Sequence, residues 1–112
     1  MPGARRRAPA LPSLAYAGEA ARGLVSRHRR EADARALASQ LGRVEAIVNE
    51  LQADHELYRG SLQFVFDRCD PIYFELLERR RHRASPVPDD VITSLEAELV
   101  AFKQANRRTD GA

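Results

Sequence analysis

Three histidines are the first residues that could hold a metal ion or move a proton near neutral pH. They are His28, His55 and His82. A di-iron helical bundle binds its metals through Glu-x-x-His pairs, yet the residues three positions before these histidines are Val25, Gln52 and Arg79. His55 continues an apolar pattern, which favours a partly buried imidazole that hydrogen-bonds across a bundle. The sequence therefore predicts no metal site and no cofactor.

A single cysteine, Cys69, is the strongest nucleophile in the chain. Nucleophilic catalysis needs a base and an orienting acid beside the thiol, whereas Cys69 ends an apolar helical pattern, as a buried small hydrophobe does. The chain has no glycine-rich phosphate loop and no glycine-flanked serine elbow. Paired acids such as Asp89 and Asp90 are explained as helix caps. We therefore expect no catalytic residue and a protein that is not an enzyme.

Arginine supplies 17 of the 18 basic residues and clusters in two places where a polyanion could bind. The clusters consist of Arg5, Arg6 and Arg7 near the N-terminus, and of Arg79, Arg80, Arg81 and Arg83. Between them, residues 31–78 carry four arginines against ten acids. Cations at a helix C-terminus oppose the macrodipole, which explains the second cluster without a ligand. The functional alternative is contact with the phosphates of DNA or RNA.

An apolar pattern with alternating steps of three and four residues runs from Ala34 to Cys69 and predicts an amphipathic helix. Its members form the expected helix-packing stripe: Leu37, Leu41, Val44, Val48, Leu51, His55, Tyr58, Leu62 and Val65. A continuous helix over 34–69 would be ~54 Å long, far beyond the ~13 Å radius of gyration of a domain of this size. We therefore expect a break at Arg59-Gly60-Ser61, and association with a second copy or a partner protein.

The remaining segments divide the chain further. Residues 1–13 hold three prolines and three consecutive arginines, which predicts a disordered basic arm. We expect one helical domain over 14–108 and a frayed tail over 109–112. Within that domain, residues 14–30 are helix-compatible, and Asp70-Pro71 predicts a helix start that turns Ile72, Tyr73, Leu76 and Leu77 inward. A stiff linker over 85–89 then leads to a last helix with the inward residues Ile92, Leu95, Leu99 and Phe102.

Residues 61–77 also fit a β-hairpin, because apolar residues alternate on both sides of the polar turn DRCDP. The alternating residues are Leu62, Phe64, Phe66, Ile72, Phe74 and Leu76. Upstream, the segment LASQLG over 37–42 with the later Val48 and Leu51 resembles the spacing of a helix-turn-helix. Segment 33–77 would then form a winged helix. Against this, Glu45 and Glu50 on the would-be recognition helix would repel DNA phosphates.

Taken together, these patterns predict an all-α protein: a small bundle of three to four helices with a long central helix. No run approaches ~18 apolar residues, so we expect no membrane span and a cytoplasmic protein. We expect it to act by protein–protein contact, as a homo-oligomer or as an accessory or regulatory subunit of a larger complex. The alternative is a DNA- or RNA-binding regulator that uses segment 33–77 or the two arginine clusters. No small-molecule substrate is evident.

Overall fold

A computed structural model describes the backbone of residues 14–109 and the side chains of residues 21–109. The chain divides into two parts, Met1–Ala32 and Asp33–Ala112. In the first part, residues 14–32 are helical and every described side chain is exposed. The expected basic arm with Arg5, Arg6 and Arg7 lies outside the described residues, as do residues 110–112 of the expected tail.

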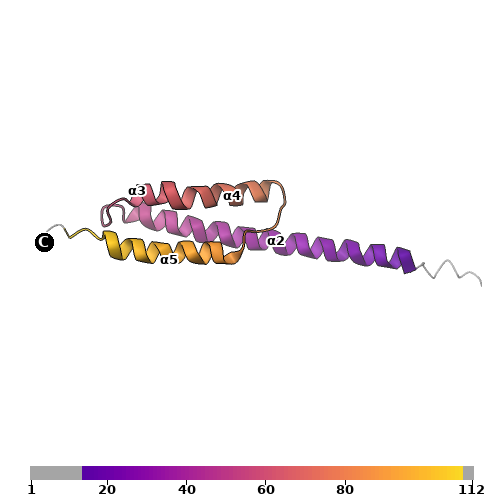
Figure 1. Ribbon diagram of the computed structural model, residues 1–112. Helices are drawn as coiled ribbons and strands as arrows, with labels where there is room; N and C mark the ends of the chain where they lie inside the picture. Colours follow the sequence, from indigo (N-terminus) through magenta and orange to yellow (C-terminus); the bar gives the residue numbers. More distant parts are fainter. Residues whose placement is uncertain (1–13, 110–112) are drawn as a thin grey trace, which may run out of the picture. The chain divides into compact units, whose positions relative to one another are not determined.

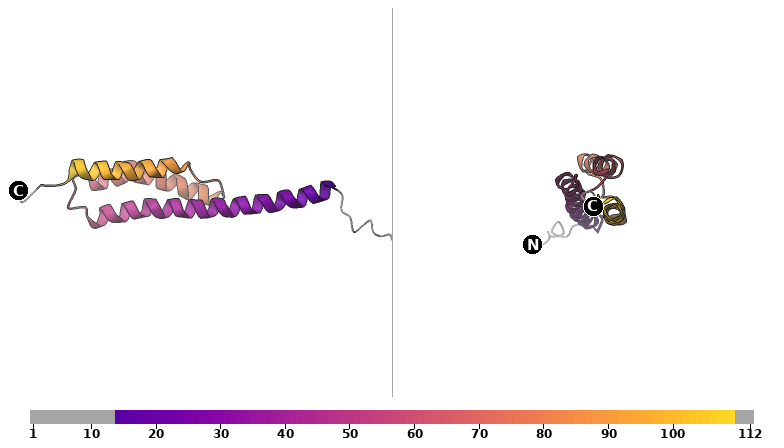
Figure 2. Two further views of the ribbon diagram at one scale, coloured as in Figure 1. Left: turned by 90° about the horizontal axis from the view of Figure 1, so that it is seen from below. Right: turned by 90° about the vertical axis from the view of Figure 1, so that its left-hand side faces the viewer.

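Every regular element in residues 14–109 is a helix, which confirms the all-α class. The elements are α2 (Leu14–Ala53), α3 (Ser61–Phe64), the π turn η2 (Val65–Cys69), α4 (Asp70–Arg81) and α5 (Asp89–Asn106). Because α3, the π turn and α4 follow one another without a gap, they form one helix over residues 61–81, named helix 61–81 below. In the second part, residues 33–53 of α2, helix 61–81 and α5 lie side by side as a three-helix bundle (Figures 1 and 2).

The winged-helix alternative is wrong, because the segment expected to form its hairpin is helical. Alternation with period two and helical spacing coincide over a short stretch such as Leu62, Phe64 and Phe66. Packing separates the two interpretations here: Phe64 enters the core, whereas Leu62 and Phe66 remain exposed.

The core of the bundle takes one apolar stripe from each helix. Its buried members are Leu37, Leu41, Val44, Ile47 and Leu51 from α2; Tyr58 from the turn after α2; Phe64, Val65, Cys69 and Leu76 from helix 61–81; Val87 from the linker; and Ile92, Leu95 and Leu99 from α5. Each large aliphatic side chain removed from water contributes about 1.5–3 kcal/mol. The inner face of α5 therefore lies where its spacing predicted. Val48, Ile72, Tyr73, Leu77 and Phe102 pack half-buried around this core.

The expected packing stripe is interrupted after Leu51, because α2 ends at Ala53 and a turn follows. His55 lies in this turn and is exposed, with Nδ1 3.1 Å from the carbonyl oxygen of Gln52. Leu62 is 67% exposed. The predictions of a partly buried His55 and an inward Leu62 are therefore wrong. Tyr58 and Val65, the other two stripe members after Leu51, are buried as predicted. The chain reverses direction at this point, so the helical register of α2 does not continue across the turn.

The reversal occupies residues 54–60, so α2 ends six residues before the predicted break, whereas Gly60 directly precedes the next helix as predicted. Gly60 has φ +74°, a left-handed conformation that an L side chain rarely adopts. The chain before it is fastened to the end of α5: the Arg59 N–H donates to the Asn106 carbonyl at 2.8 Å, and the Arg108 N–H to the Leu57 carbonyl at 2.9 Å. The turn between α2 and α3 is therefore held by backbone hydrogen bonds as well as by its glycine.

Asp70 does not cap a new helix, contrary to the prediction from Asp70-Pro71. Its backbone is helical (φ −58°, ψ −45°), and the chain is helical on both sides of it. A proline inside an α-helix lacks an N–H and collides with the carbonyl four residues earlier, here Asp67. The π turn widens the helix at this place, and the Asp70 N–H bonds to the Val65 carbonyl five residues back. Helix 61–81 therefore passes through Pro71 without a break.

Gly60→Ala tests the reversal. The added Cβ would meet only the Phe102 ring, at 4.0 Å, so the cost comes from the backbone conformation. We expect a loss of about 1 kcal/mol in the free energy of unfolding. Gly42→Ala is the matched control, because this helical glycine has no atom within 4 Å of an added Cβ. It should raise stability by about 0.5–1 kcal/mol. Urea unfolding followed by circular dichroism measures the free energy of unfolding of both variants. Equal effects of the two substitutions would contradict the left-handed conformation as the reason for a glycine at position 60.

Candidate interaction surface

Three large apolar side chains of helix 61–81 point away from the core. Leu62, Phe66 and Phe74 are 67%, 71% and 61% exposed, and we call these three residues the outer face. Asp70 stands between the two phenylalanines, four residues from each. Single exposed apolar residues are common on protein surfaces, whereas several on one side of a helix are typical of an interaction site.

The π turn places these residues on one side of the helix. A step of four residues advances an α-helix by ~40°, so the three steps from Leu62 to Phe74 would rotate the last side chain by ~120° from the first. The π turn closes through the bond from the Asp70 N–H to the Val65 carbonyl and therefore holds more residues per turn. A four-residue step through the π turn therefore rotates less about the helix axis than the same step in an α-helix. The smaller rotation keeps Leu62, Phe66 and Phe74 on a common side.

A groove of about 370 Å³ lies beside the outer face, between α2 and α4. It is lined by Glu45, Val48, Asn49, Gln52, Asp70, Tyr73 and Phe74. The Tyr73 hydroxyl donates to Oε2 of Glu45 at 3.1 Å. The rings of Tyr73 and Phe74 meet edge to face, with centroids 6.0 Å apart. Two carboxylates, two amides and two aromatic rings thus line one depression.

The two carboxylates of the groove carry charge that no neighbouring cation neutralises. Among residues 21–109, neither Glu45 nor Asp70 has an arginine, lysine or histidine nitrogen within 4.0 Å. The Glu45 carboxylate, which accepts the Tyr73 hydroxyl, raises the pKa of Tyr73, because it favours the protonated phenol. The groove therefore holds two carboxylates that form no ion pair with a described side chain.

The second arginine cluster is used in part by the fold. Arg79 donates from Nε to Glu75 at 2.7 Å and from Nη1 to the carbonyls of Ser85 and Pro86, both at 3.1 Å. Arg83 has φ +54° and takes the left-handed position that ends α4. Its N–H bonds to the Arg80 carbonyl at 3.1 Å. Two members of the cluster thus shape the exit from α4.

Arg81 lies 3.8 Å from Glu78, and its side chain is 75% exposed. Arg80 makes no ion pair with any described side chain. Of the four arginines in this cluster, Arg79 is therefore the one whose side chain bonds to the linker after α4, while Arg83 contributes its backbone.

Cys69 is fully buried, and burial together with the nearby Asp70 raises the pKa of its thiol to about 11. The thiol is therefore protonated at neutral pH and packs as a small hydrophobe. Among the described side chains of residues 21–109, no three from His, Cys, Asp or Glu are grouped as metal ligands. No helix in the same range is long and apolar enough to cross a membrane.

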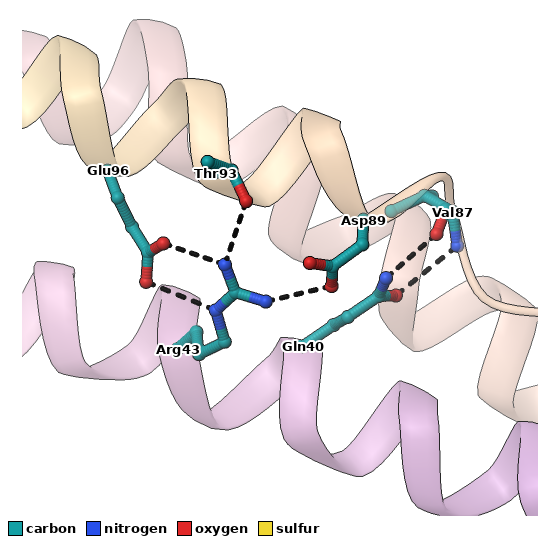
Figure 3. A network of polar contacts seen from close by, with 6 residues as sticks. All are labelled: Gln40, Arg43, Val87, Asp89, Thr93 and Glu96. Carbon is teal, nitrogen blue, oxygen red and sulfur yellow. Dashed lines mark hydrogen bonds and ion pairs between the residues drawn. The ribbon is translucent and has the colours of Figure 1, made fainter.

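Two polar residues of α2 hold the linker and α5 in place (Figure 3). Gln40 is 3% exposed; its Nε2 donates to the Val87 carbonyl at 2.7 Å, and its Oε1 accepts the Val87 N–H at 3.2 Å. Arg43 donates to Asp89 at 2.8 Å and to both carboxylate oxygens of Glu96 at 2.7 and 3.1 Å. The Glu96 carboxylate raises the pKa of Arg43 above its usual value. The linker therefore cannot move away from α2 without breaking buried hydrogen bonds.

Sequence reasoning missed both Gln40 and the outer face. The available signal for Gln40 was a glutamine between the apolar pair Leu37 and Leu41, three residues after the first. The signal for the outer face was the four-residue step from Leu62 to Phe66, which is also compatible with a strand. No protein-family model, curated protein or solved structure matches this chain.

Gln40→Leu should be strongly destabilising, because it leaves the N–H and the carbonyl of the buried Val87 without partners. Each of the two unsatisfied buried groups costs about 1–3 kcal/mol, so we expect a total loss of about 2–6 kcal/mol. Gln104→Leu is the control, since Gln104 is exposed on α5. Thermal and urea unfolding measure the two variants. Similar small effects in both would show that the Gln40 hydrogen bonds contribute little.

The pair of Arg43 and Glu96 predicts a dependence of stability on pH. Hydrogen bonding to Arg43 holds the pKa of Glu96 below its usual value. Such a carboxylate stabilises the protein above its unfolded-state pKa of about 4.3, and the contribution disappears as the pH falls through the lower folded-state pKa. Since Glu96 is 42% exposed, solvent screens the pair, and Glu96→Gln should cost at most about 1 kcal/mol at pH 7.

Urea unfolding of wild type and Glu96→Gln from pH 7 to pH 2.5 measures this difference. We expect the difference in the free energy of unfolding between the two proteins to shrink toward zero below about pH 4. Glu56→Gln is the control for the loss of a negative charge, because Glu56 lies exposed in the turn after α2. A constant difference between wild type and Glu96→Gln over the whole range contradicts the ion pair as its cause.

Proposed function

We propose that this protein is a non-enzymatic helical bundle that binds another protein chain through the outer face of helix 61–81. The observation that carries the proposal is the exposure of Leu62, Phe66 and Phe74, each above 60%, on one side of a helix. Covering side chains of this kind on association removes apolar surface from water, at about 25 cal/mol per Å². The chain would act as a homo-oligomer or as an accessory subunit of a larger complex.

The fixed ends of the bundle support this proposal. Leu57 and Arg59 are bonded to the end of α5, and Val87 is bonded to Gln40 of α2. Both connections between the helices are therefore held, and the outer face is presented by a rigid element. A surface that is ordered before binding loses less conformational entropy when a partner docks.

We also propose a cytoplasmic location, where a lone thiol such as Cys69 stays reduced.

The double variant Leu62→Ser/Phe66→Ser tests the proposal. Both side chains are exposed, so the substitutions should leave the unfolding midpoint nearly unchanged while they abolish association. Sedimentation velocity over a range of protein concentrations measures self-association. Affinity capture with the full chain, followed by reconstitution with the purified partner, measures association with another protein.

Val100→Ser is the matched control, because Val100 is 55% exposed on α5, outside the outer face. It should bind like wild type. The proposal fails if the wild-type chain is monomeric and binds no purified partner. It also fails if the double variant and Val100→Ser associate with the same affinity as wild type.

A further inference from the structure

The groove beside the outer face has a chemistry that the outer face lacks. We propose that it receives an arginine side chain of the bound partner, with the guanidinium group held by Glu45 and Asp70 and stacked on the rings of Tyr73 and Phe74. This inference rests on the proposed function, because it names the chemistry by which a partner on the outer face is recognised.

The carboxylates provide the first argument. Glu45 and Asp70 face one groove from two helices, and no nitrogen of a described basic side chain lies within 4.0 Å of either. Some other acids of the bundle are paired, as Glu98 is with Arg68 at 2.6 and 2.9 Å. An incoming cation would therefore meet two carboxylates that are free to accept charge-assisted hydrogen bonds.

The aromatic rings provide the second argument. Phe74 lines the groove although it is 61% exposed, and Tyr73 beside it is held by its hydrogen bond to Glu45. A cation within about 6 Å of a ring centroid is attracted by the ring quadrupole, and arginine makes this contact more often than lysine. The bundle already contains such contacts, since Lys103 and Arg107 lie 5.6 and 5.8 Å from the centroid of Tyr58.

The amides select a guanidinium over an ammonium group. Asn49 and Gln52 add two carbonyl oxygens to the groove, so that carboxylates and amides together can accept several of the five N–H donors of arginine. An ammonium is a compact, strongly hydrated charge that does not stack, whereas the planar guanidinium is weakly hydrated and does. A groove of about 370 Å³ also has room for the apolar stem of an arginine.

The protein's own cations do not fill the groove. Arg80 is close enough to Tyr73 to lower the pKa of the phenol, but Glu45 raises that pKa by more. Arg80 forms no ion pair with Glu45. Arg68 is bound to Glu98. Since Phe74 belongs to both the outer face and the groove, a partner chain that covers the outer face reaches the groove with its next side chains.

The test uses the full chain labelled with ¹⁵N and titrated with N-acetyl-arginine methylamide. We expect saturable shifts of the amide signals of Asn49, Asp70 and Phe74 in the millimolar range. The citrulline analogue has the same shape without the charge and should cause no such shifts. The lysine analogue should bind at least threefold more weakly. Equal binding of arginine and citrulline, or of arginine and lysine, overturns the assignment of a guanidinium.

The double variant Glu45→Gln/Asp70→Asn should weaken binding of the arginine probe at least tenfold, whereas Glu56→Gln removes a charge outside the groove and should bind like wild type. Equal binding of all three proteins overturns the proposal. The variant Leu62→Ser/Phe66→Ser leaves the groove intact and should still bind the probe. If the arginine probe fails to bind wild type while that variant loses its partner, the groove inference is wrong and the proposed function stands.

Discussion

The π turn at Val65–Cys69 decides what helix 61–81 buries and what it exposes. Without the wider turn, Pro71 would collide with the Asp67 carbonyl, and the helix would be kinked or broken there. With it, the helix continues, Val65 and Cys69 enter the core, and the outer face stays on one side. The groove depends on the same feature, because Asp70 follows the π turn directly and shares the groove with Glu45 of α2.

Specific hydrogen bonds hold the two connections between the helices of the bundle. The linker before α5 is bound to Gln40, and the turn after α2 is bound to the backbone at Asn106 and Arg108. These bonds lie at the two connections between helices, where a small bundle would otherwise open first. They allow a core built from only a few residues of each helix to present a fixed surface.

Two sets of charged residues have different consequences for the structure. Arg43, Arg68 and Arg79 are bonded to carboxylates or carbonyls of the same chain and hold helices and linker together. Glu45 and Asp70 have no such partner among the described residues, although they lie beside exposed aromatic rings. An uncompensated charge near apolar surface is what a partner of opposite charge can use for specificity.

The sequence by itself determined the all-α class, the stripe from Leu37 to Leu51 and the reversal at Gly60, because helical periodicity and left-handed glycine turns are local properties. Only the tertiary structure decided that residues 61–77 are helical, that His55 lies outside the core, and that Leu62 and Phe66 face outward. These outcomes depend on which side of each helix faces the neighbouring helices. After the chain has reversed direction, the pattern of apolar residues does not specify which side of the next helix faces the core. The same holds for the groove, since Glu45 and Asp70 come together only when α2 and α4 pack.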